Sequence, residues 1–203
     1  MKKIYQIILI LLIIGITNIN AQTNQIGIIS NAANAELSDY LNKIPVGQEN
    51  MFGFNNRGEF FQAEIGIPYE VFTLNTEFFD TKNIIRTKTY IVSTENWRVP
   101  IIVNNQHRAL LTVSKVNNQW SVVKIGAKGL AEELDMFNKN HPSIDESNIL
   151  RVFQLKGDFI LTSQNIIYPL TSAKQLLSVE GDNDVSYSLH DMLILVKNKI
   201  IRN

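Results

Sequence analysis

The side chains best suited to acid–base catalysis or metal binding are three histidines, His107, His141 and His190. Two histidines that bind one metal from a single helix stand four residues apart, and these three are much farther apart in the sequence. His190 directly precedes Asp191, but adjacent residues of a helix point to different faces, so this pair is not a charge relay. We expect His107 to be a solvated residue at the start of a strand and His141 to end a helix. A site that uses these histidines must be assembled from distant segments.

Motifs for nucleophilic catalysis and cofactor binding are missing. There is no G-x-S-x-G nucleophile elbow and no S-x-x-K motif with its supporting elements. The absence of cysteine excludes a thiolate nucleophile, a disulfide framework and a cysteine-ligated metal. Gly126-Ala127-Lys128-Gly129 has too little specificity to indicate phosphate binding, and Glu180–Asp184 lacks the spacing of a calcium loop. We therefore predict no catalytic, cofactor-binding or metal-ligating residue, and whether the protein is an enzyme stays open.

Gln62-Ala63-Glu64-Ile65-Gly66 and Trp97 resemble the contact residues of cystatins, a family of cysteine-protease inhibitors. Cystatins insert a Q-x-V-x-G loop into the protease cleft, helped by a tryptophan hairpin. Gln62 and Gly66 match that loop, whereas Glu64 stands at the valine position and Trp97 follows asparagine instead of proline. A charge at position 64 is costly to bury in an apolar cleft. The resemblance implies a protease inhibitor as one alternative function.

Aromatic residues stand close to predicted turns between residues 51 and 97. Some of them are adjacent pairs, such as Phe60-Phe61 and Phe78-Phe79, and adjacent residues of a strand face opposite sides of a sheet. The sheet is therefore either covered on both faces or presents an open apolar surface to a small molecule or a partner segment. The residues of this candidate binding surface are Phe52, Phe54, Gln62, Gly66 and Trp97.

Composition places the chain among folded proteins without general affinity for polyanions. Its 203 residues suffice for one ordinary domain, and 45% of them are hydrophobic, enough to build a core. The 19 basic and 19 acidic residues give no net charge, which argues against nucleic-acid binding through phosphate neutralisation.

Residues 1–21 have the organisation of a secretory signal peptide. Two lysines precede an apolar run over residues 7–16, and Ala21 supplies the small residue at the cleavage site. The run is shorter than the roughly 18–20 residues that span a bilayer, although Ile19 is larger than usual near a cleavage site and an uncleaved anchor is the alternative. We predict cleavage near Ala21 and a soluble protein exported to the periplasm or the extracellular space, with no second membrane span.

The remaining residues predict an α+β fold, in which an antiparallel β-meander sheet packs against helices in a cystatin-like or NTF2-like manner. The meander consists of the β-rich runs Val99–Val103, His107–Val116 and Gln119–Ile125. Asn104-Asn105-Gln106 and Asn117-Asn118 separate these runs, and two asparagines between β-rich runs favour a tight turn with positive φ. The second turn places Lys115 opposite Trp120 and Val113 opposite Val122.

Amphipathic spacing and turn residues predict the other elements. The predicted helices are Asn34–Lys43, Lys128–Lys139, Ser172–Val179 with a capping box from Ser172 to Gln175, and a final helix capped by Ser188 that buries Leu189, Met192, Leu193, Val196 and Ile200. The further predicted extended segments are Glu59–Leu74, Ile84–Ser93, Ile149–Leu155 and Phe159–Thr162. Residues 22–140 are expected to form the α+β domain, and residues 141–203 either extend its sheet or form a small second lobe.

These patterns favour an exported, non-catalytic binding or accessory protein. Its expected partner is an unidentified protein or a small apolar ligand, without a cofactor, nucleic acid or membrane span. A secreted hydrolase whose site is assembled only in three dimensions is the second hypothesis, and the cystatin-like inhibitor is the third.

Overall fold

The structure is a computed structural model that describes residues 25–144, 146–178 and 185–202. The predicted signal peptide and the acidic segment Glu180–Asp184 lie outside these residues. The strands are β1 (Glu64–Ile65), β2 (Tyr69–Leu74), β3 (Ile91–Val103), β4 (Gln106–Val116), β5 (Gln119–Gly126), β6 (Ser147–Val152), β7 (Gly157–Thr162), β8 (Ile166–Pro169) and β9 (Tyr187–Ser188). The α-helices are an N-terminal helix whose described part covers residues 25–42, α2 (Thr76–Asp80), α3 (Lys128–Asn140), α4 (Thr171–Leu177) and α5 (Leu189–Arg202). Short 3₁₀ helices are η1 (Glu49–Phe52), η2 (Arg57–Gln62), η3 (Thr87–Tyr90) and η4 (Phe153–Leu155).

The described strands form one nine-stranded sheet in the order β5-β4-β3-β2-β6-β7-β8-β9, with β1 also paired to β3. β2 and β6 are parallel, with Val71 opposite Ile149, and the other described pairs are antiparallel. This mostly antiparallel sheet and its packing helices confirm the predicted α+β class. They do not confirm a cystatin-like or an NTF2-like fold.

The β3–β4–β5 meander is built as its asparagine pairs predict. Both turn residues have positive φ in each case, at 52° and 57° for Asn104 and Asn105 and at 49° and 63° for Asn117 and Asn118. Asparagine tolerates this left-handed conformation better than other residues with a side chain. Lys115 pairs with Trp120 across the second turn, and its Nζ lies 5.8 Å from the centre of the indole ring.

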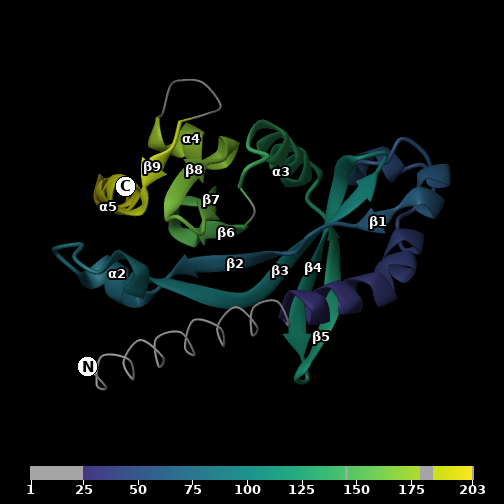
Figure 1. The fold of residues 1–203 in the computed structure, drawn as a ribbon, viewed down its shortest axis with the longest axis horizontal. Coiled ribbons are helices and arrows are strands. Elements are labelled where there is room, and N and C mark those ends of the chain that lie inside the picture. The colour runs from purple at the N-terminus through teal and green to yellow at the C-terminus, as the bar shows by residue number, and fades with distance from the viewer. Residues whose placement is uncertain (1–24, 145, 179–184, 203) are drawn as a thin grey trace, which may run out of the picture.

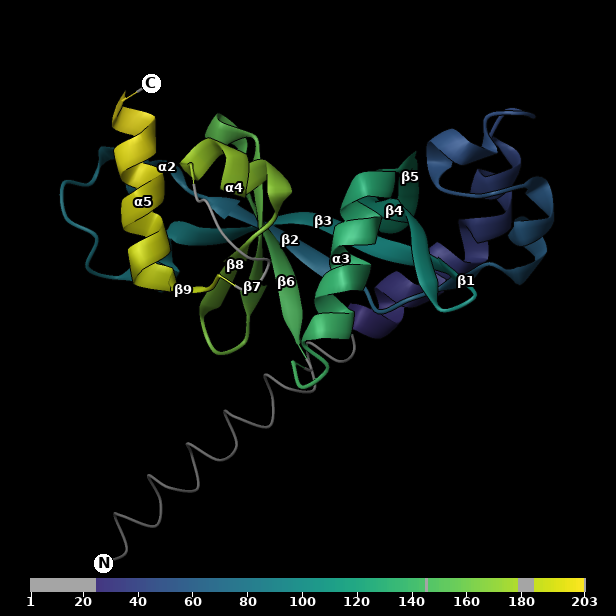
Figure 2. The same cartoon turned by 90° about the horizontal axis from the view of Figure 1, so that it is seen from above.

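Helices cover both faces of the meander (Figure 1). Successive residues of β4 face opposite sides, so Leu111 joins the core beneath the N-terminal helix while Leu110 packs with Leu134 and Phe137 of α3. The molecule is elongated, with α2 and α5 at one end and β1 at the other (Figure 2). The interpretation of a sheet covered on both faces therefore holds for β3 and β4.

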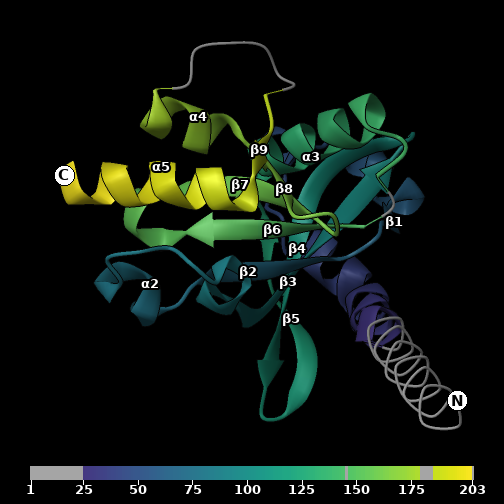
Figure 3. The same cartoon turned by 60° about the vertical axis from the view of Figure 1, so that its left-hand side comes forward.

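Beyond β2, the strands β6–β9 continue the sheet, and α4 and α5 lie over them (Figure 3). Ser188 caps α5 as predicted, because its Oγ accepts a hydrogen bond from the Asp191 amide at 3.1 Å. The predicted apolar face of α5 packs into the core of this half, together with Phe78 of α2 and Phe159 of β7. No helix among the described residues is long and apolar enough to span a bilayer.

Four sequence-based boundaries are wrong, one of them that of the predicted extended segment Ile149–Leu155, whose last three residues form η4 (Phe153–Leu155). The N-terminal helix is already present at residue 25 instead of starting at Asn34. The segment predicted as one strand, Glu59–Leu74, contains most of η2 before β1 and β2, since the Asn56 side chain accepts from the Gly58 amide and begins the 3₁₀ turn. Phenylalanine is common in strands because it packs well on a half-buried sheet, not because its backbone prefers to be extended. The phenylalanines of this segment therefore do not require a strand. Of the predicted run Ile84–Ser93, only the residues from Ile91 onward belong to a strand.

The predicted capping box of α4 is also absent. The N-cap of this helix is Leu170, which offers no side-chain acceptor. The Ser172 hydroxyl instead accepts a hydrogen bond from the Asp158 amide at 3.0 Å and so joins α4 to β7. The Ser172 hydroxyl therefore makes a contact between two elements instead of the helix cap that the local motif predicts.

Candidate functional site

The candidate site is a cavity of about 430 Å³ beside the link between β1 and β2. Cavities of roughly 300–1,000 Å³ are typical of small-ligand sites. Its walls come from the N-terminal helix (Ile26), the link Gly66–Pro68, β3 (Trp97, Ile102), β4 (His107), the end of α3 (Asn138, His141) and the start of β6 (Ser147, Asn148).

The cavity reaches both faces of the sheet at this link. Trp97 belongs to the core beneath the N-terminal helix, and Ile26 packs against the same core. His107 lies on the other side, where Asp135 of α3 and the backbone of Ala131 act on its ring. Groups that belong to two different packing layers therefore line one space.

Two of the residues that line this cavity carry a buried nitrogen without a hydrogen-bond partner within the described chain, Trp97 at Nε1 and His107 at Nδ1. Trp97 is only 3% exposed. Buried polar groups in folded proteins are nearly always hydrogen-bonded, and an unsatisfied one costs about 1–3 kcal/mol. A ligand that accepts a hydrogen bond from the indole N–H would remove that cost.

Burial lowers the pKa of His107, and the charge of Lys139 acts in the same direction. Asp135 and a hydrogen bond with the Ala131 backbone oppose this shift without cancelling it. The ring is therefore neutral at pH 7. Nδ1 of this ring has no hydrogen-bond partner among the described residues, and it offers a ligand a lone pair or an N–H according to the tautomer.

Tyr69 and Asn138 brace the cavity wall between β2 and α3. Asn138 Nδ2 donates a hydrogen bond to Tyr69 Oη at 2.7 Å, and burial raises the pKa of Tyr69. Asn148 Oδ1 accepts from the Glu70 amide at 3.1 Å, which joins β6 to β2 at the same place. These bonds connect three elements around the cavity and fix its shape without a ligand.

The charge of the lining selects against anions. Among the described residues that line the cavity, Glu146 is acidic and none is a lysine or arginine. A carboxylate or phosphate entering here would meet no fixed cation. Neutral groups with a hydrogen-bond acceptor fit this lining, and basic groups fit the neighbourhood of Glu146.

The side-chain types needed for hydrolysis lie in the same cavity, but no catalytic contact joins them. Glu146 and Ser147 line it along with His107. A nucleophile activated by a base requires hydrogen-bond contact between the two, and no hydrogen bond joins His107 to Ser147 or Glu146 in the described part of the chain. No cluster of three or more potential metal ligands occurs among the described residues.

Two of the five residues singled out from the sequence, Gly66 and Trp97, line this cavity. The other three do not: Phe54 is buried and packs edge-on against Phe60 at 5.1 Å, Phe52 is half-buried, and Gln62 is an exposed residue at the end of η2. Phe54 and Trp97 are both buried, because the N-terminal helix covers their side of the sheet.

The segment that resembles a cystatin loop does not protrude as such a loop. Its residues Glu64 and Ile65 form β1 and pair with Ile102 and Ile101 of β3. The tryptophan that the resemblance places in a contact hairpin is the buried Trp97. This geometry differs from the paired loops that the resemblance implies.

Sequence reasoning missed His107, Tyr69 and Asn138 as cavity residues. His107 is half-buried and not the solvated residue that we expected. His141 does end α3 as predicted, which brings it to the cavity. No local signal marks the missed residues, because their shared position depends on how α3 and β6 pack against the β1–β2 link.

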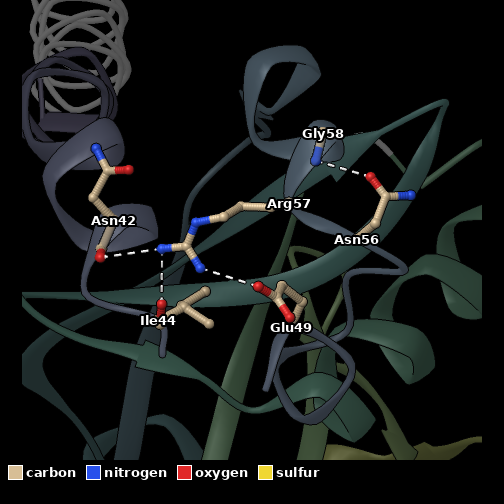
Figure 4. Close-up of polar contacts among 6 residues, drawn as sticks. All are labelled: Asn42, Ile44, Glu49, Asn56, Arg57 and Gly58. Atoms are coloured by element: carbon tan, nitrogen blue, oxygen red, sulfur yellow. Dashed lines mark hydrogen bonds and ion pairs between the residues drawn. The ribbon is translucent and has the colours of Figure 1, made fainter. Parts of the chain in front are cut away.

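Near the predicted aromatic residues, polar contacts of Arg57 hold its segment against the end of the N-terminal helix and Glu49 (Figure 4). Arg57 donates to Glu49 Oε1 at 3.0 Å and to the Ile44 carbonyl at 3.0 Å, and a longer bond reaches the Asn42 carbonyl. The guanidinium thus satisfies free carbonyls at the end of the N-terminal helix. Since its donors are engaged, we assign Arg57 a structural role.

Comparison with known proteins adds no family to this geometry. No protein-family model matches the chain, and neither a curated protein nor a solved structure shows significant similarity to it.

Proposed function

We propose that the protein is an exported, non-catalytic binding protein whose ligand occupies the cavity beside the β1–β2 link. The observation that carries this proposal is that two residues lining one cavity, Trp97 and His107, each have a buried nitrogen without a hydrogen-bond partner among the described residues. The cost of leaving both unsatisfied is offset when a ligand bonds to them. The expected ligand is a neutral molecule with an apolar body that carries both a carbonyl oxygen and an N–H group, as an amide does.

Indole N–H signals in a ¹⁵N–¹H NMR spectrum test this proposal directly. The chain has two tryptophans, and a Trp120→Phe variant identifies the signal of Trp97. Titration with a library of neutral amides should shift the Trp97 signal and leave that of Trp120 in place. A library of carboxylic acids of similar size serves as the matched control and should bind more weakly.

If no neutral fragment moves the Trp97 signal at millimolar concentration, the cavity is not a ligand site of this kind. Turnover of a bound fragment that His107→Asn abolishes would contradict the non-catalytic part of the proposal.

Export is a separate part of the proposal and is supported by the order of charged, apolar and small residues in positions 1–21. Fractionation of producing cells, followed by N-terminal sequencing, should yield a chain that starts at Gln22. A chain that retains Met1 in the membrane fraction would contradict it.

A further inference from the structure

The edge of the sheet beside the cavity is open along β1 and the link that follows. β1 has β3 as its partner, and the described residues pair no strand to its other edge. Gly66 donates its amide to the Pro100 carbonyl at 2.8 Å. The backbone N–H and C=O groups of successive residues alternate in direction along an antiparallel ladder. Those of Ile65 and Ile67 therefore point away from β3.

Ile67 provides both a free backbone and an exposed apolar side chain at this edge. Its amide makes no hydrogen bond to any described residue, and its side chain is 71% exposed. It lines the cavity together with Gly66 and Pro68. An unpaired strand edge next to an apolar cavity is the arrangement that receives an added strand, with main-chain bonds for affinity and pockets for alternate side chains.

The extension of the cavity to both faces of the link fits an added strand better than a compact small molecule. Successive side chains of an extended peptide point to opposite faces. At this edge, one set would point toward Ile26 and Trp97 and the other toward His107 and Asn138. The carbonyl and amide groups of a peptide also match the indole donor and the imidazole Nδ1.

Charge restricts the sequence of such a peptide. Glu64 on the edge and Glu146 in the lining are both exposed carboxylates, and no lysine or arginine of the described chain lines the cavity. An acidic peptide would be repelled by these groups, whereas a neutral or basic one would not.

We propose that the edge formed by β1 and Gly66–Pro68 binds an extended, neutral or basic peptide segment of another protein as an added strand, with its apolar side chains in the cavity. This inference rests on the proposed function, since it names the ligand class of the same cavity.

The experiment titrates the purified chain with the peptide acetyl-Thr-Val-Leu-Val-Thr-amide and follows the Trp97 indole signal and calorimetric heat. We expect saturable binding, at least tenfold weaker when alternate peptide amides are N-methylated, and at least tenfold weaker when the central leucine is replaced by aspartate. N-methylation removes the strand-pairing donors and leaves the side chains intact, so this arm does not depend on the folding of any variant.

Variants of the protein test the same strand pairing from the other side. Ile67→Pro removes the free amide at the edge, and Ile85→Pro is its matched control, since Ile85 is 80% exposed in a loop and does not line the cavity. With both variants folded by circular dichroism, Ile67→Pro should weaken peptide binding at least tenfold and Ile85→Pro should leave it unchanged.

Equal affinity of the methylated and unmethylated peptides overturns the added-strand inference. Neutral fragments that shift the Trp97 signal while no peptide does so also overturn it, but leave the proposed binding function in place. Failure of fragments and peptides alike removes both.

Discussion

A Cβ atom placed on Gly66 would lie 2.9 Å from Ile102 Cδ1 and 3.1 Å from Pro100 Cβ. The absence of a side chain at position 66 thus allows the β1–β2 link to approach β3 closely enough for its hydrogen bond to the Pro100 carbonyl. The same close approach forms one wall of the cavity.

Replacement of this glycine should be destabilising. Gly66→Ala forces the Pro100 ring or the link to move, and overpacking of this kind costs about 1–3 kcal/mol. Urea denaturation measures the free energy of unfolding. Gly129→Ala is the control, because an added Cβ at Gly129 in α3 meets nothing within 4 Å and alanine favours a helix. A Gly66→Ala protein as stable as the wild type would contradict the close approach.

Two substitutions of Trp97 distinguish its contribution to core packing from its contribution to ligand recognition. Trp97→Ala should lower the free energy of unfolding by about 3–5 kcal/mol, because a large buried side chain leaves a cavity in the core. Trp97→Phe retains an aromatic ring and removes the unsatisfied N–H, so it should cost less than the alanine change while weakening the binding of carbonyl ligands. Denaturation and ligand titration of both variants check this. Unchanged ligand affinity in a folded Trp97→Phe protein would exclude the indole N–H from recognition.

Stability should depend on pH through His107. Its pKa in the folded protein lies below the ordinary value of 6.5 because burial disfavours the charged ring. Between the two pKa values the unfolded chain binds more protons, so this contribution to stability is present above pH 6.5 and is lost as the pH falls below it.

Denaturation between pH 5 and pH 8 measures this effect, and His107→Asn should flatten the slope below pH 6.5. The exposed His190 provides the control His190→Asn, which should retain the wild-type slope. Identical slopes in all three proteins would show that His107 is not desolvated as described.

The turn between β4 and β5 depends on a left-handed residue at position 118. The φ of Asn118 is 63°, and a β-branched residue is strongly disfavoured there. Asn118→Val should therefore cost about 1–2 kcal/mol, measured by the urea midpoint. Gln119→Val, at the exposed first position of β5, should cost much less because valine favours a strand. Equal losses for the two variants would argue against the turn geometry.

Local chemistry explains which elements the sequence predicts correctly. The asparagine pairs require positive φ and so define the turns and register of β3, β4 and β5, and Ser188 supplies its own cap to α5. Each of these features depends on residues within a few positions of one another. The α+β class follows from them, because an antiparallel meander and amphipathic helices must bury their apolar faces together.

The cavity and the order of the sheet depend instead on contacts between distant residues. The parallel pairing of Val71 with Ile149 and the contact between Asn138 and Tyr69 bring α3 and β6 beside the β1–β2 link. The burial of Trp97 follows from the N-terminal helix that covers it, and the burial of His107 from its position against α3. A sequence pattern reports the face to which a side chain points, but only the packed chain determines what lies opposite that face. For this reason the sequence determined the class and the turns, and the tertiary structure decided where the cavity lies.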